Sequence, residues 1–199
     1  MDGFTDSMIR LTEAFARMPG IGRKTAERLT YYVLRAPDAE IEKLAQAVRD
    51  VKGTVRHCSE CHNITERDPC AICADSRRDH GTICVVEEPK DLFALEKAGA
   101  YRGVYHVLLG RIAPLDNVGP EDLTVQSLIE RARRPDVNEI IMATNPTLEG
   151  DGTALYIRQQ LEPLDVRVTR LARGVSAGSS IEYANPAILS EALGGRTSL

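Results

Sequence analysis

The apolar residues near the start of the chain recur at helical spacing. The first stripe, with spacings of three, four and three positions, consists of Met8, Leu11, Phe15 and Met18. It predicts a helix that Asp6 or Ser7 caps and that stops before Pro19, because the residue preceding a proline is pushed out of the α region. A second helix is expected to begin near Arg23. Its buried stripe would comprise Ala26, Leu29 and Val33.

A third helix is expected to follow Pro37-Asp38, and Gly53 is placed as the residue just beyond its end. Its apolar stripe again has spacings of three, four and three and consists of Ile41, Leu44, Val48 and Val51. The first quarter of the chain is therefore predicted to be all helical.

From Thr82 onward, strand-like apolar runs alternate with helical patterns. The expected strands are 82–87, 104–109, 138–144 and 166–171. The expected helices are 91–98, 123–134 and 153–161, and residues 110–122 are expected to form a long loop. Such alternation implies a parallel sheet.

Two Cys-x-x-Cys pairs lie between these regions, and eight residues separate them. The four cysteines are Cys58, Cys61, Cys70 and Cys73. Two such turns facing each other give the tetrahedral sulfur array of a closed structural zinc site, whereas two disulfides or a redox dithiol are the alternatives. His57 and His62 could replace a ligand, but four cysteines already fill the coordination sphere. The fifth cysteine, Cys84, is expected to be a buried apolar residue.

The glycine-rich turn between the first two helices carries the second chemical signal. Gly20 and Gly22 leave backbone N–H groups uncovered, and the following helix directs its N-terminus into the turn, which favours anion binding. Lys24, Arg28 and Arg35 share one helix face and could bracket a phosphate chain. The turn resembles a helix-hairpin-helix, which grips DNA without reading bases. A plain helical hairpin with a solvated basic face is the alternative.

Acidic residues follow two of the predicted strands. In open parallel sheets, ligands bind and reactions occur at these carboxyl ends of the strands. Glu87 ends the first strand, and Glu149 and Asp151 follow the third on what we expect to be a loop. Converging carboxylates could bind Mg²⁺. The pattern resembles a Toprim domain, although Glu149 and Thr153 stand where that family carries aspartate and a further acid. A solvated acidic surface is the alternative, and the tyrosines are expected to pack. These are Tyr101, Tyr105, Tyr156 and Tyr183.

Composition narrows the possible partners. The net charge of −4 argues against strong autonomous nucleic-acid binding, although basic residues outnumber acidic ones between Arg10 and Ala36. Aromatic residues make up 5% of the chain and tryptophan is absent, so a base-stacking platform is not obvious. No apolar run approaches the length of a membrane span, and together with the cysteine pattern this predicts a cytoplasmic protein.

The order of these parts resembles the RecR family of bacterial recombination mediators along essentially the whole chain. The matching segments are 18–22, the two cysteine pairs, 82–89, 101–108, 143–153 and 171–183. Ser176 and Ser179 depart from the family's usual proline and glycine.

This resemblance implies a non-enzymatic protein that forms a ring-shaped homotetramer around single- or double-stranded DNA, without sequence preference. It also implies that the protein acts with RecO and RecF in recombinational repair and helps to load RecA onto single-stranded DNA. Gly20, Gly22, Lys24 and Arg28 would contact DNA. Glu87, Glu149 and Asp151 would form a docking surface for RecO or part of the inner rim, and 186–193 would join subunits.

The predicted fold class is α+β overall. A helix-hairpin-helix module would span residues 1–53, and a four-cysteine motif that holds one structural Zn²⁺ would span residues 54–76. An α/β Toprim domain would follow over residues 77–172, and an oligomerisation segment over residues 173–199. The zinc site would fix how the modules on either side of it face each other. The competing hypotheses are a Mg²⁺-dependent Toprim nuclease or primase, and a generic zinc-stabilised interaction module.

Overall fold

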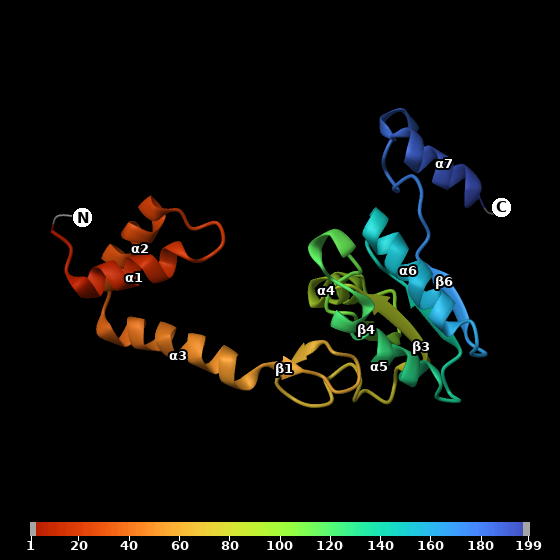
Figure 1. The fold of residues 1–199 in the computed structure, drawn as a ribbon, viewed down its shortest axis with the longest axis horizontal. Helices are drawn as coiled ribbons and strands as arrows, with labels where there is room; N and C mark the ends of the chain where they lie inside the picture. The colour runs from red at the N-terminus through yellow and green to blue at the C-terminus, as the bar shows by residue number, and fades with distance from the viewer. Residues whose placement is uncertain (1–2, 197–199) are drawn as a thin grey trace. The chain divides into compact units, whose positions relative to one another are not determined.

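The computed structural model describes residues 3–196, so the outermost residues of the predicted first and last domains, 1–2 and 197–199, lie outside it. The chain divides into two compact units, with the boundary between Val55 and Arg56. The first unit is helical, and the second combines a small cysteine-rich motif with an α/β domain, so the fold is α+β as predicted (Figure 1).

Three helices build the first unit: α1 (Asp6–Ala16), α2 (Arg23–Arg35) and α3 (Asp38–Thr54). Two buried threonines join α1 to α2, because the Thr12 and Thr30 hydroxyl oxygens lie 2.8 Å apart. The predicted cap of α1, Asp6 or Ser7, was wrong. The cap is Thr5, whose hydroxyl accepts the Met8 N–H, so Asp6 lies in the first helical turn.

The third helix differs from the prediction at its end and along its apolar stripe. It continues through Gly53 to Thr54, because Val55 turns to extended backbone and supplies the cap. Its stripe does not pack within the unit, since Leu44, Val48 and Val51 stay 50–61% exposed. Helical spacing thus predicted the helix correctly, while its apolar face has no partner among the described residues.

The second unit begins with β1 (Arg56–His57) and β2 (Ile64–Thr65), which pair antiparallel at the base of the cysteine loops. Its main sheet is parallel and has the order β4-β3-β5-β6. The strands are β3 (Asp79–Val86), β4 (Gly103–Val107), β5 (Glu139–Met142) and β6 (Arg167–Arg170).

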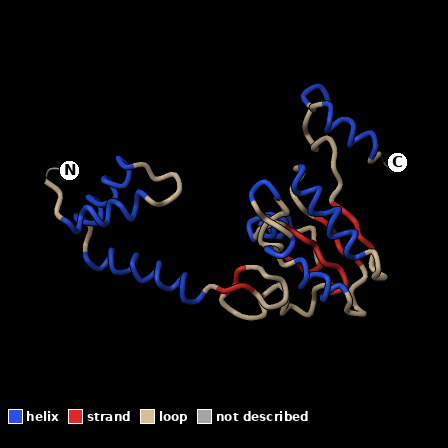
Figure 2. Tube along the Cα trace, viewed as in Figure 1, coloured by secondary structure: helices blue, strands red, loops and turns tan. Residues whose placement is uncertain are grey.

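Helices cover both faces of this sheet (Figure 2). Ile83 and Val85 of β3 pack in one cluster with residues of α5 (Val125–Ala132) and α6 (Leu148–Leu161). Cys84 and Val86 point the other way, toward Leu92 of α4 (Pro89–Ala98). Because both faces are buried, β3 appears in the sequence as a continuous apolar run, and Cys84 is buried as predicted.

The predicted loop 110–122 contains two short 3-10 turns, η1 (Pro114–Asp116) and η2 (Pro120–Asp122). After β6 come a third such turn, η3 (Ile181–Tyr183), and the final helix α7 (Pro186–Gly194). Tyr183 does not pack, because 82% of it is exposed, whereas Tyr105 is fully buried as predicted. Within residues 3–196, no helix is both long and apolar enough to cross a membrane.

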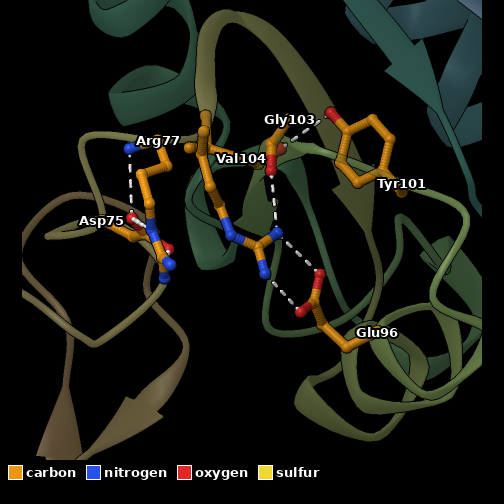
Figure 3. A network of polar contacts seen from close by, with 7 residues as sticks. Asp75, Arg77, Glu96, Tyr101, Gly103 and Val104 are labelled. Atoms are coloured by element: carbon orange, nitrogen blue, oxygen red, sulfur yellow. Dashed lines mark hydrogen bonds and ion pairs between the residues drawn. The ribbon is translucent and has the colours of Figure 1, made fainter.

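A polar network fastens the connector after the cysteine motif to the edge of the sheet (Figure 3). The Arg78 guanidinium donates hydrogen bonds to both carboxylate oxygens of Glu96 on α4, at 2.6 and 2.8 Å. It also donates to the Gly103 carbonyl oxygen. The Tyr101 hydroxyl lies between the carbonyl oxygens of Thr82 and Val104, at 2.9 and 3.0 Å. The cysteine motif therefore enters the α/β domain through a fixed segment.

Candidate nucleic-acid interface and zinc centre

The hairpin between α1 and α2 is a tight turn that needs glycine. Ile21 donates its N–H to the Met18 carbonyl at 3.1 Å, and Gly20 has a φ of +77°. Proline at the second position and a left-handed residue at the third are the features of a type II turn. A side chain at Gly20 would be strained, although no atom would collide with it.

The turn delivers the chain to α2 with its first N–H groups uncovered. Gly22 is the N-cap, and no side chain caps this end of the helix. Lys24 and Arg28 are exposed, and they lie one turn apart on the same face. The structure thus brings together, in one unit, the free N-terminal donors and the two basic residues predicted to contact DNA.

The four cysteines converge as the sequence predicted. Their sulfur atoms all lie within 4.8 Å of one another. Cys61 and Cys70 are buried, and their sulfurs are 3.6 Å apart. This spacing fits a tetrahedron of Zn–S bonds, for which bonds of about 2.3 Å place the sulfurs about 3.8 Å apart.

The chemistry of this donor set also fits a divalent cation. The hydrogen bond between the Cys61 and Cys70 sulfurs lowers the pKa of Cys70 and raises the pKa of Cys61. Thiol hydrogen bonds therefore favour one thiolate at the expense of its neighbours. A Zn²⁺ ion would hold all four as thiolates, and the four cysteines form its structural site.

The neighbouring histidines are not needed as ligands. The Nδ1 atom of His57 lies 3.0 Å from the His62 carbonyl oxygen, and the Nε2 atom of His62 lies 2.8 Å from the Ser127 hydroxyl. The cysteine cluster is thus completed without them. Cys58 also donates its N–H to the Asn63 carbonyl, which closes the first turn.

A buried arginine that the sequence did not predict fastens the zinc motif to the α/β domain. Arg131 on α5 is 6% exposed and donates to the Tyr105 and Glu60 carbonyl oxygens, at 2.6 and 3.3 Å. Val107 of β4 donates its N–H to the Cys61 carbonyl at 2.8 Å. The motif is therefore joined to the edge strand β4 by a backbone hydrogen bond and to α5 by the Arg131 side chain.

His106 lies beside this junction and is fully buried. Its Nε2 atom faces the Thr124 hydroxyl at 3.0 Å, and its ring meets His62 edge-on with centroids 5.2 Å apart. Burial lowers the pKa of His106 to about 3, so its imidazole is neutral at pH 7. Nothing in the local sequence pattern pointed to Arg131 or His106, because their partners are distant in the chain.

Glu87 follows β3 as expected, but its carboxylate is already occupied. It is 3% exposed, and both its oxygens accept hydrogen bonds from Asn145, from the backbone and side-chain nitrogens, each at 2.8 Å. Gly150 packs against the same pair, and a Cβ there would collide with the Asn145 carbonyl oxygen. Glu87 therefore holds the loop after β5 against the start of α6.

The other two acids lie on a helix, which corrects the predicted loop. Thr147 caps α6 by accepting the Gly150 N–H at 3.0 Å, so Glu149 and Asp151 occupy its first turn. Arg173 binds Asp151 and lowers the pKa of that carboxyl, and it also reaches Glu191 at 3.2 Å. Glu149 is exposed.

The ligand oxygens of these three acids, all within the described residues, do not lie close enough together to share one ion. Within residues 3–196, the four cysteines are the cluster of three or more ligand side chains close enough to share an ion. Thr153, at the position of a further Toprim acid, is fully buried. Its hydroxyl donates to the Glu149 carbonyl at 2.7 Å and accepts the Ile112 N–H at 2.9 Å. This position therefore anchors the loop before η1.

Fold and site together define a class: a helix-hairpin-helix module joined to a four-cysteine zinc motif and a Toprim-type α/β domain. Three family descriptions match consecutive segments of the chain. The helix-hairpin-helix of RecR matches residues 8–52, the four-cysteine zinc finger domain of RecR matches residues 55–75, and the Toprim domain matches residues 81–172.

Similar proteins of known name match over nearly the whole chain. A protein named "Recombination protein RecR" from Rhodopirellula baltica is 50% identical over 199 residues, which is 100% of both chains. Proteins of the same name from Bifidobacterium animalis subsp. lactis and Staphylococcus aureus strain Newman are 52% and 46% identical, with 94% and 98% of this chain covered. The matches cover 94% and 99% of those two relatives. The chain belongs to the RecR family.

Proposed function

We propose that this protein is a non-enzymatic DNA clamp that acts in recombinational DNA repair. Its relatives are named recombination proteins, and its parts follow the order of that family. The observation that carries the proposal is the hairpin of the first unit. There the uncapped start of α2 lies beside exposed Lys24 and Arg28.

This hairpin would bind the phosphate backbone and leave the bases unread. Backbone N–H groups at Gly20 and Gly22 would approach one phosphate, and Lys24 and Arg28 would neutralise its neighbours. The contact is charge-based, so binding would be independent of sequence and would weaken as salt rises. Single- and double-stranded DNA both offer this backbone.

A ring of four copies would provide the affinity that one copy lacks. The net charge of −4 opposes DNA binding by a single chain, while several hairpins around one hole act at high effective concentration. Exposed apolar side chains support self-association through two regions. They are Leu44, Val48 and Val51 on α3, and Ile181, Tyr183 and Leu193 in the C-terminal segment.

The acidic end of α6 is our candidate docking surface for RecO. Glu149 and Asp151 both lie in the first turn of that helix; Glu149 is exposed to a basic partner, and Asp151 is paired with Arg173. Glu87 would contribute by holding the supporting loop, because it is itself buried. RecF would act in the same assembly, whose outcome is the loading of RecA onto single-stranded DNA in the cytoplasm.

Three observations favour a clamp over a Toprim nuclease or primase. Glu87 is engaged by Asn145, Asp151 is paired with Arg173, and Thr153 replaces a carboxylate. A two-metal or one-metal phosphotransfer site needs converging free carboxylates. A Mg²⁺-dependent activity on labelled DNA that is lost in Glu87→Gln would contradict this part of the proposal.

The direct test is the affinity for a short fluorescent DNA, measured by anisotropy across a salt series. Lys24→Ala/Arg28→Ala should bind at least about tenfold more weakly and show a shallower salt dependence. Lys43→Ala/Lys52→Ala removes two exposed charges from α3 and is the matched control. Equal affinities of all three proteins, with equal oligomeric mass, would overturn the assignment of the hairpin.

A further inference from the structure

The basic face of α2 also carries two exposed tyrosines. Arg28, Tyr31, Tyr32 and Arg35 stand at positions i, i+3, i+4 and i+7, so they form one stripe along the helix, one turn beyond Lys24. Tyr31 and Tyr32 are 42% and 50% exposed. An arginine therefore lies on each side of a pair of accessible aromatic rings.

These side chains line an open depression of about 600 Å³ that lies wholly within the first unit. Its remaining wall is Ala36, Pro37 and Glu40 at the start of α3. Glu40 accepts a hydrogen bond from the Tyr32 hydroxyl, which fixes that ring at its polar end. Phe4 and Tyr31 pack in a T-shaped arrangement with ring centroids 5.5 Å apart, and 42% of Tyr31 stays exposed.

Two properties of this depression point to a nucleotide. The two arginines outnumber the one acid, Glu40, so an anionic ligand is favoured. The tyrosine faces offer apolar, polarisable surface, on which any base can stack whatever its sequence. Arginine beside an exposed aromatic ring is the combination that proteins use to hold unpaired strands.

We propose that this depression binds an unpaired nucleotide of single-stranded DNA. A base stacks on Tyr31 or Tyr32, and the flanking phosphates contact Arg28 and Arg35. The proposal rests on DNA binding by the adjacent hairpin and adds a strand preference to it. Bases in a double helix are stacked on each other and cannot reach the tyrosines, so duplex DNA uses the hairpin alone.

The composition of the chain did not predict this site. With 5% aromatic residues and no tryptophan, stacking was not expected from the sequence. The signal is the placement of the two tyrosines between arginines at helical spacing. The same exposed rings could instead contact a second copy of the chain. The arginines on both sides favour a polyanion over an apolar partner surface, and the test below separates the two.

The experiment compares anisotropy-derived affinities for labelled oligo-dT and for a duplex of equal length. Tyr31→Ala/Tyr32→Ala should bind oligo-dT about fivefold more weakly or worse, and the duplex within about twofold of the unchanged protein. Tyr31→Phe/Tyr32→Phe keeps the rings and should retain both affinities. Leu34→Ala, a 65% exposed residue elsewhere on α2, is the matched control and should change neither.

A second readout does not depend on the alanine variant folding. Because the chain lacks tryptophan, tyrosine emission is visible, and oligo-dT should quench part of it. The Tyr31→Phe/Tyr32→Phe protein should bind oligo-dT normally but lose that part of the quenching. Unchanged quenching in this variant would overturn the stacking proposal.

Lys24→Ala distinguishes this proposal from the general one. It should weaken binding of oligo-dT and duplex alike. If Lys24→Ala acts in this way but the alanine variant binds oligo-dT normally, the tyrosine site is wrong and the hairpin stands. If Lys24→Ala changes neither affinity, the hairpin is wrong. A changed oligomeric mass in the tyrosine variants would assign the depression to a second copy and overturn the nucleotide site.

Discussion

Glu87 occupies the position of a Toprim metal-binding acid, but in this structure it is a buried hydrogen-bond acceptor. In the sequence it is an acid at the end of a buried strand. In the structure it is buried and accepts two hydrogen bonds from Asn145, 58 residues further along. A buried carboxylate with two donors stabilises the fold, and its oxygens are no longer free for a metal ion.

We therefore expect Glu87→Gln to destabilise the protein rather than to abolish a reaction. The new amide group would place a donor against the Asn145 side-chain amide, so one hydrogen bond is lost and a buried polar group is left unpaired. The free energy of unfolding should fall by about 1–3 kcal/mol, measured by urea denaturation. Glu66→Gln, at an exposed position, should change it by less than about 0.5 kcal/mol. Equal stability of both variants would contradict the role of Glu87.

The Arg78–Glu96 pair gives a pH-dependent prediction. Arg78 donates to both carboxylate oxygens and holds the pKa of Glu96 below its ordinary value. A depressed folded pKa stabilises the fold above the unfolded value of about 4.3, and this stabilisation is lost as the pH falls through the folded pKa. Glu96→Gln should therefore lower the urea midpoint at pH 7, and its difference from the unchanged protein should shrink below about pH 4. A difference that persists in full at about pH 3 would contradict the ion pair.

At the scale of elements, the zinc motif shows which features are readable from sequence. Two cysteine pairs close in sequence need only local turns to converge, so the spacing predicted the site correctly. Its attachment to the α/β domain was not readable, because Arg131 lies 71 residues beyond Glu60. The strands and helices were likewise predicted from local periodicity. The helix α6 begins at Leu148, before the expected start at 153, because the Thr147 side chain caps it, and no cap was predicted there from the sequence.

Loss of zinc should therefore increase hydrogen exchange in the main sheet. Cys70→Ser should lose the metal, measured by atomic absorption, and should expose the Val107 amide, whose partner is the Cys61 carbonyl. Hydrogen exchange of peptides covering β4 should then accelerate, and chelation of the unchanged protein should do the same. Cys84→Ala alters a buried cysteine outside the cluster and should keep one zinc per chain. Unchanged exchange in β4 after zinc loss would show that the motif is not coupled to the sheet.

At the scale of the whole molecule, the clamp that we propose would account for three features of the chain. The chain carries a helix-hairpin-helix despite a net charge of −4, and both α3 and the C-terminal segment expose apolar side chains. Encirclement of DNA would need no base readout, and several weak hairpins facing one strand would bind it through their effective concentration. In the sequence the α3 surface appeared as an ordinary amphipathic stripe, because periodicity alone does not say whether a stripe packs within one chain or between chains.

The mass of the protein in solution tests this account most directly. Sedimentation velocity at micromolar concentration, with and without a DNA long enough to pass through a ring, should give a species of four chains of 21.9 kDa each. The DNA should co-sediment with that species. A chain that stays monomeric under both conditions and does not move the DNA would contradict the clamp.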